Sequence, residues 1–160
     1  MSIHQAPIFF KPDFSGDGIK EASRMLRDSF RVDELHSGEE VLVEGVLRVI
    51  YANLLDKDML WEVTRKHLLN KQVQVLTLIV DGQDELTRLV EFIGSNVNPQ
   101  RCEEGSLRYI FGGGKKKIPG TNAYWFENKI HRPRTLDEAQ AHFNALFADD
   151  LSWGRIIGRR

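Results

Sequence analysis

The chain has 160 residues, of which 41% are hydrophobic, 9% aromatic and 28% charged. This length suits one compact domain with enough apolar side chains for a sizeable core. The 22 Lys and Arg residues nearly cancel the 23 Asp and Glu residues, which excludes a basic nucleic-acid coat and an acidic disordered tail. The single cysteine, Cys102, cannot form an internal disulfide. Because the N-terminus lacks a signal-peptide pattern and no apolar run approaches a membrane span, we expect a soluble, cytoplasmic protein.

The first fifty residues predict two strands separated by a helix. Residues 6–10 form a short apolar run that ends at Lys-Pro-Asp, which is typical of a buried strand followed by a turn. Apolar residues recur at helical spacing over residues 17–30, after a Gly-Asp-Gly turn. Residues 32–40 are polar and predict a loop, whereas the β-branched residues of 41–50 predict a strand.

The middle of the chain predicts a helix, a strand and a second helix. Residues 59–68 carry a helical apolar stripe, with Asp58 as a candidate N-cap. Residues 73–80 form the most strongly strand-like run of the sequence. Residues 84–93 again have an apolar face, and Gly94 is placed to cap that helix at its C-terminal end.

The last third predicts a loop, an aromatic strand and a final helix. Residues 112–117 (Gly-Gly-Gly-Lys-Lys-Lys) indicate a flexible basic surface loop, within an enlarged loop at 112–122. They lack the glycine spacing and the following helix of a phosphate-binding P-loop. Residues 123–126 predict a strand, and Thr135 is a good N-cap for a helix that starts at Leu136. A tail at 148–160 ends the chain, and its apolar residues 152–157 could pack on a neighbouring subunit or form a loose terminus.

Strands and helices that alternate in this way favour an α+β fold of one domain. We expect a small sheet covered by helices, of the split βαβ, ferredoxin-like kind. A doubly wound fold is the alternative, but its Gly-rich fingerprint is absent after the first strand.

Among the five histidines, His131 is the best candidate for chemistry. It follows the aromatic strand and lies among the cations of Lys129-Ile130-His131-Arg132-Pro133-Arg134. A neutral imidazole is nucleophilic near pH 7, and neighbouring cations favour a polyanionic substrate. Lys11, Arg88 and Arg108 would form a phosphate site if the fold brought them together, because guanidinium groups match phosphate oxygens.

Five segments, in this order, resemble the nucleoside diphosphate kinase family over roughly residues 7–147. The chain has a strand that ends in Lys-Pro-Asp, a second strand closed by Asp-Gly, and then a helix that carries Arg88. It continues with a Gly-x-x-x-Asn-Pro turn and Gly-Ser-Leu-Arg. Last comes Asn-x-x-His before the final helix. These segments are residues 9–13, 78–82, 84–93, 94–108 and 128–139.

The resemblance implies a ping-pong phosphotransferase that moves the terminal phosphate of a nucleoside triphosphate to a diphosphate. His131 would be the nucleophile. Mg²⁺ would bridge the phosphates, and the protein would assemble as a homo-oligomer. The resemblance also implies a nucleotide-binding set: Lys11, Arg88 and Arg108 for the phosphates, Asn128 for the ribose, Tyr51 beside the histidine and Leu60 near the base.

The sequence departs from the family pattern around the histidine. Pro133 stands where the family has a serine that supports the histidine, and His142 stands where it has a glutamate that orients the ring. Leu60 aligns near the aromatic residue that stacks on the base, and the segment 111–127 is longer than in the family.

Two further functions remain open from the sequence. One is a non-catalytic nucleotide-binding relative with a regulatory or assembly role. The other is a ferredoxin-like nucleic-acid-binding module that uses the lysines at 115–117 with Arg155, Arg159 and Arg160. The near-neutral charge and the lack of a paired aromatic strand motif argue against nucleic acid.

Overall fold

The computed structural model describes residues 2–147. The tail at 148–160 lies outside the described residues, and so do the apolar segment 152–157 and the three arginines named for nucleic acid. Both expectations therefore stay predictions. In the part of the chain that is described, no helix has the length and apolar character needed to cross a membrane.

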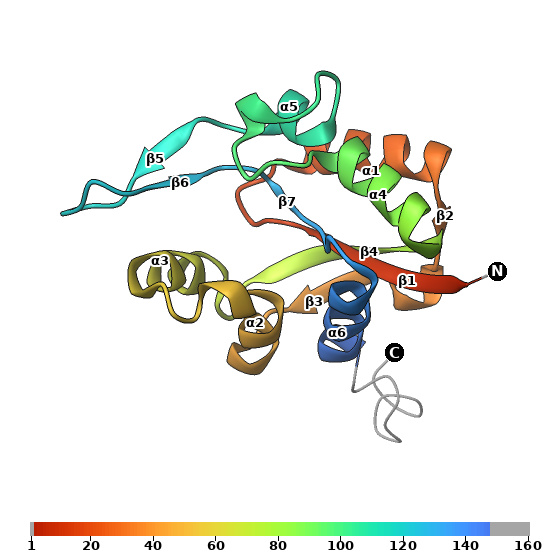
Figure 1. Ribbon diagram of the computed structural model, residues 1–160, viewed down its shortest axis with the longest axis horizontal. Helices are drawn as coiled ribbons and strands as arrows, with labels where there is room; N and C mark the ends of the chain where they lie inside the picture. The colour runs from red at the N-terminus through yellow and green to blue at the C-terminus, as the bar shows by residue number, and fades with distance from the viewer. Residues whose placement is uncertain (1, 148–160) are drawn as a thin grey trace.

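A five-stranded antiparallel sheet forms the centre of the molecule (Figure 1). Its two long strands, β1 (Ile3–Phe10) and β4 (Gln72–Asp81), pair along their whole length, from Ile3 opposite Asp81 to Phe10 opposite Gln74. The strand order is β2-β4-β1-β7, and β3 also pairs with β4. The short strands are β2 (Arg31–Val32), β3 (Gly38–Val41) and β7 (Ile130–His131). Each crossover spans one intervening antiparallel strand, which confirms the split, ferredoxin-like arrangement.

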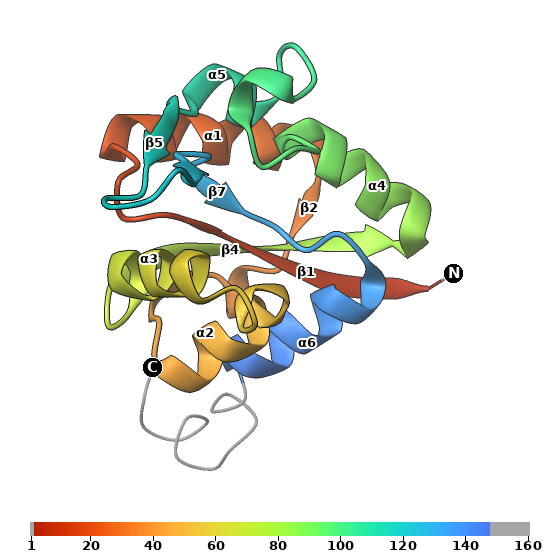
Figure 2. The ribbon, with the colours of Figure 1, turned by 60° about the vertical axis from the view of Figure 1, so that its left-hand side comes forward.

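Helices cover both faces of this sheet (Figures 1 and 2). One face carries α1 (Gly16–Ser29) and α4 (Gly82–Ile93), and the other carries α2 (Glu44–Ile50), α3 (Asp58–Leu68) and α6 (Leu136–Phe147). The short helix α5 (Leu107–Phe111) lies on the α4 side. Three single 3₁₀ turns complete the helical elements: Glu34–His36, Ala52–Leu54 and Pro99–Arg101.

Two hydrophobic cores lie back to back on β1 and β4. Ile8 and Leu78 point into the core under α1 and α4, whereas Phe9 and Val75 point into the core under α2, α3 and α6. Successive side chains of a strand alternate between the two faces, so each long strand serves both cores. This double burial explains why residues 6–10 and 73–80 are mostly apolar, and it confirms both predicted strands.

The predicted strand over residues 41–50 is wrong. Only Val41 belongs to a strand, and residues 44–50 form α2. Leu47 and Ile50 are buried three residues apart and pack into the second core, which is helical spacing. Packing of this face therefore outweighs the strand preference of the β-branched residues.

The remaining helices are confirmed, with one correction at a cap. Thr135 caps α6, since its hydroxyl accepts a hydrogen bond from the Glu138 N–H at 3.1 Å. Gly94 ends α4 with a φ of 133°. Asp58, however, is the first residue of α3 rather than its N-cap, and the cap position is Lys57.

The aromatic strand exists, but it belongs to a separate hairpin. β6 (Tyr124–Phe126) pairs with β5 (Lys115–Lys117) in a two-stranded sheet, with Trp125 opposite Lys116. The predicted flexible loop over residues 112–117 is therefore partly a strand. The hairpin extends from the body of the molecule on the side of α3 (Figure 1).

Candidate functional site

A pocket of about 380 Å³ lies beside β7, between α3, α6 and the β5–β6 hairpin. This volume is in the range of small-molecule sites. The pocket gathers most of the residues predicted from the sequence. Those that line it are Lys11, Tyr51, Leu60, Arg108, Asn128 and His131.

His131 is fixed by aromatic contacts from three segments. It pairs with Phe9 across β1 and β7, and its ring stacks on the Phe9 ring with centroids 5.0 Å apart. The Tyr51 ring lies 5.0 Å away, and His131 Nε2 is 3.4 Å from Nδ1 of His142. Burial lowers the pKa of His131 well below its usual value, and His142, Lys11, Arg108 and Arg132 lower this pKa further. The ring is thus neutral at pH 7 and nucleophilic.

Lys11 directly follows the last residue of β1, and Asn128 holds its side chain in place. Its Nζ donates to Oδ1 of Asn128 at 2.6 Å, and its main-chain N–H donates to the Lys129 carbonyl at 2.8 Å. Lys129 has a φ of 67°, a backbone conformation that few non-glycine residues adopt. Burial, with the nearby Arg108 guanidinium, lowers the pKa of Lys11 to about 7.

Two buried arginines are clamped by main-chain carbonyls. Arg108 donates to the carbonyls of Ile130 (2.8 Å), Asn96 (2.9 Å) and Gly94 (3.3 Å). Arg132 donates to the same Gly94 carbonyl from Nε and Nη2, at 3.2 and 2.9 Å. These bonds leave Nη1 of Arg132 without a partner among the described residues. Both arginines therefore keep their charge at the pocket in a fixed position.

Tyr51 brings an unpaired polar group to the same pocket. Its hydroxyl is buried and has no hydrogen-bond partner among the described residues. Burial raises the pKa of Tyr51 above its usual value, so this hydroxyl keeps its proton. An unpaired buried hydroxyl carries a desolvation cost that a bound polar ligand can relieve.

The two departures from the family pattern lie directly at the histidine. Pro133 is buried and presents no hydroxyl. His142 faces His131 from α6, and burial lowers the pKa of His142 to about 4, so the residue at the glutamate position is neutral. Glu138, one helical turn earlier, bonds to Arg134 instead, at 2.7 Å from its main-chain N–H and 3.1 Å from its guanidinium.

The structure does not bring Arg88 to this pocket. Arg88 lies on α4, where its guanidinium is 4.1 Å from the centre of the Phe30 ring and donates to the Ser29 carbonyl at 3.1 Å. It therefore packs against the end of α1, and the fold does not bring Arg88 together with Lys11 and Arg108 in the position that the resemblance implies. Other cations take part instead, because Lys57, Arg132 and Arg134 also line the pocket. Arg132 could have been proposed from its position next to His131.

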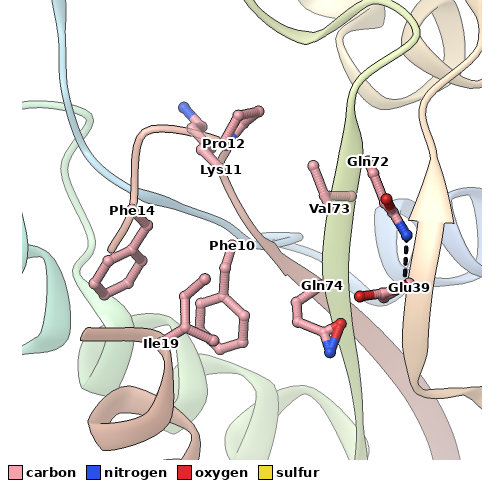
Figure 3. Close-up of a pocket in the computed structure, with 9 residues that line it drawn as sticks. All are labelled: Phe10, Lys11, Pro12, Phe14, Ile19, Glu39, Gln72, Val73 and Gln74. Carbon is pink, nitrogen blue, oxygen red and sulfur yellow. Dashed lines mark hydrogen bonds between the residues drawn. The ribbon is translucent and has the colours of Figure 1, made fainter. Parts of the chain in front are cut away.

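A second, smaller cavity of about 200 Å³ shares only Lys11 with the first (Figure 3). Its walls include Phe10, Ile19 and Gln74, and Gln72 donates to Glu39 at its edge. Figure 3 shows the Lys11 side chain directed away from Phe10 and Ile19. The Lys11 ammonium group is therefore assigned to the pocket that contains His131.

Fold comparison identifies solved structures of one enzyme class. Nucleoside diphosphate kinase from Aquifex aeolicus has a TM-score of 0.63 and 18% identity, covering 90% of this chain and 94% of that chain. The enzyme from Borrelia burgdorferi, solved as a transition-state mimic with bound vanadate and ADP, has a TM-score of 0.64 and 19% identity, with coverages of 92% and 89%. The apo enzyme from Encephalitozoon cuniculi has a TM-score of 0.60 and 19% identity, with coverages of 98% and 97%.

Sequence comparison gives no such match: neither a protein-family model nor a curated protein matches the chain. The fold and pocket thus define an α+β protein with a histidine in a cationic pocket. The particular fold is that of the nucleoside diphosphate kinases, at a low level of identity.

Proposed function

We propose that this protein is a nucleoside diphosphate kinase-like phosphotransferase that works through a phosphohistidine at His131. The observation that carries the proposal is the neutral ring of His131 in a pocket with five cationic side chains and one carboxylate among its described residues. The cations are Lys11, Lys57, Arg108, Arg132 and Arg134, and the carboxylate is Glu138. Such a pocket favours a polyanion such as a nucleoside triphosphate.

The contacts of His131 support attack by one particular nitrogen. Nε2 lies 3.4 Å from Nδ1 of His142, so His142 engages Nε2 and leaves Nδ1 as the nitrogen for attack; this attack uses the tautomer in which Nε2 carries the proton. In the first half-reaction, Nδ1 forms a bond to the terminal phosphorus, and the bond to the bridging oxygen breaks. The nucleoside diphosphate leaves with that electron pair. In the second, a terminal oxygen of another diphosphate attacks the phosphorus and His131 is released.

The cations of the pocket would stabilise the charge of the transferring group. Lys11 and Arg132 have polar hydrogens available for phosphate oxygens, and the Tyr51 hydroxyl is unpaired. Electrostatic stabilisation and positioning account for most of the catalysis in phosphoryl transfer.

Mg²⁺ fits this scheme as part of the substrate rather than as a resident metal. No group of three metal-binding side chains occurs among residues 2–147, and Glu138 is engaged by Arg134. We expect a magnesium ion to be carried on the nucleotide phosphates. There it would neutralise part of their charge.

Phosphoenzyme formation tests the proposal. Incubation with γ-labelled ATP and Mg²⁺ should give an acid-labile, base-stable label, because phosphohistidine has this stability. His131→Asn should abolish the label. His4→Gln, on the far end of β1, is the matched control and should label like the wild type. A His131→Asn protein that labels fully would overturn the proposal.

A nucleotide-binding relative without turnover is the second candidate. Pro133 and His142 favour it, since neither supplies the hydroxyl or the carboxylate of the family pattern. In that case, ATP should raise the melting temperature of the wild type while no label forms on any residue.

A further inference from the structure

The pocket that contains His131 has a second wall of different chemistry. Besides His131 and the cations, the lining includes Leu60 and Thr64 of α3 and the three aromatic residues of β6. Leu60, Thr64 and His67 follow each other at spacings of four and three residues, so they share one face of α3. The lining from α3 and β6 is therefore uncharged and largely apolar, whereas the five cations of the pocket come from outside these two elements.

Trp125 is the aromatic residue placed over that face of α3. Its ring lies 5.5 Å from the His67 ring at an angle of 53°. Side chains alternate along a strand, so Tyr124 and Phe126 point to the opposite side of β6 from Trp125. The Tyr124 ring is in addition engaged by Lys115, whose Nζ is 4.6 Å from its centre.

The position of Trp125 is tied to the strand that carries Lys11. His67 Nε2 is 3.5 Å from Oδ1 of Asp13, and Lys129 Nζ is 3.1 Å from Oδ2 of the same carboxylate. Asp13 follows Lys11 by two residues, in the turn after β1. The ring contact of Trp125 with His67 therefore joins the hairpin to the segment that holds Lys11.

We propose that the β5–β6 hairpin is the base-recognition element of this pocket, and that the nucleobase of a bound nucleoside di- or triphosphate stacks on Trp125. This inference rests on the proposed function, because it needs the phosphates to bind at Lys11 and Arg132. Leu60 of α3 and Trp125 both line the pocket. With the phosphates at Lys11 and Arg132, the base would lie between these two side chains. Stacking on an indole accepts every base, so the hairpin adds affinity for nucleotides over inorganic polyphosphate without selecting a particular base.

The test compares two ligands that differ in the base. Binding of ADP and of tripolyphosphate is measured by calorimetry for the wild type, Trp125→Ala and Trp125→Leu. Trp125→Leu keeps an apolar side chain against His67 but removes the aromatic ring. Both variants should bind ADP about fivefold to a hundredfold more weakly, the range expected for loss of base–aromatic stacking, and should bind tripolyphosphate as the wild type does. Tyr109→Ala, an exposed aromatic of α5 outside the pocket, is the matched control and should change neither.

The outcomes separate this inference from the proposed function. If the Trp125 variants bind ADP like the wild type, or lose both ligands equally, the base-recognition role is overturned while the phosphoenzyme test stands independently. If the wild type binds neither ligand and forms no label, the proposed function fails and this inference fails with it. A selective loss of ADP in Trp125→Leu supports the inference even if Trp125→Ala does not fold.

Discussion

Lys11 shows how a buried position changes the chemistry of an ordinary side chain. Its ammonium group has a pKa near 7 in the protein without ligand, because burial and Arg108 disfavour the charged form. A phosphate ligand needs that charge, so above pH 7 binding must be accompanied by uptake of a proton.

We expect the affinity for ADP to fall as the pH rises from 7 to 9. The loss should approach tenfold per pH unit once Lys11 is mostly neutral, as expected for a single coupled proton. Lys11→Met should bind ADP more weakly at pH 7 and should lose this pH dependence. Calorimetric titrations at several pH values measure both effects. A Lys11→Met protein with the same slope as the wild type would contradict the assignment.

Most of the site residues could be predicted from the sequence, but their contacts could not. Lys11, Arg108 and His131 were recognisable because short motifs surround them in a familiar order. Arg88 was misplaced because an arginine on a helix gives no indication of its direction. Its stacking on Phe30 depends on how α1 and α4 pack, which spacing within one helix does not encode.

At the scale of elements, the C-terminal end of α4 fixes the two buried arginines of the pocket, Arg108 and Arg132. Gly94 has a φ of 133°, and its carbonyl accepts hydrogen bonds from both Arg108 and Arg132. A Cβ at this position would lie 2.8 Å from Cβ of Arg108 and from Sγ of Cys102. Glycine is thus required both by the backbone and by the neighbouring side chains.

Gly94→Ala should lower the free energy of unfolding by about 1–3 kcal/mol, the cost of a side chain in such a backbone conformation. It should also weaken ADP binding, because both arginines shift with the carbonyl. The matched control is Gly45→Ala in α2, where a Cβ would meet open space. This substitution should stabilise the helix by about 0.5–1 kcal/mol. Urea unfolding measures both changes. If both substitutions changed the free energy of unfolding equally, position 94 would not be constrained to glycine.

The longer elements that the sequence predicted correctly are those whose burial pattern is regular. The strands at 6–10 and 73–80 and the helices with one apolar face belong to this group. The short strands β2, β3, β5 and β7 have two to four residues each, too few for a periodic pattern. Helix α5 has only five residues and begins at a cap, Ser106, whose hydroxyl accepts from the Tyr109 N–H.

At the scale of the molecule, the two cores should unfold together. They share β1 and β4, whose side chains alternate between them, so neither core can persist without the central strands. This predicts one cooperative transition, as expected for a single domain.

Leu89→Ala in the first core and Leu47→Ala in the second should each lower the free energy of unfolding by about 2–5 kcal/mol. Each should shift the same single transition. Circular dichroism reports on all elements, whereas the fluorescence of Trp61, in a chain whose other two tryptophans are replaced by Phe, reports on the second core. Unfolding curves from the two probes that fail to coincide in Leu89→Ala would indicate two separate units.

Self-association and location in the cytoplasm stay predictions of the resemblance and the composition.

The hydrogen bond between Lys11 and Asn128 joins residues 117 positions apart in the chain. Contacts this distant form late, because a long loop must close before they can contribute. During synthesis, the pocket can be completed only after β7 and α6 have left the ribosome, although β1 emerges first. Nucleotide binding is therefore a property of the finished molecule, and an N-terminal fragment that ends before β7 should fail to bind a nucleotide even where its sheet has begun to form.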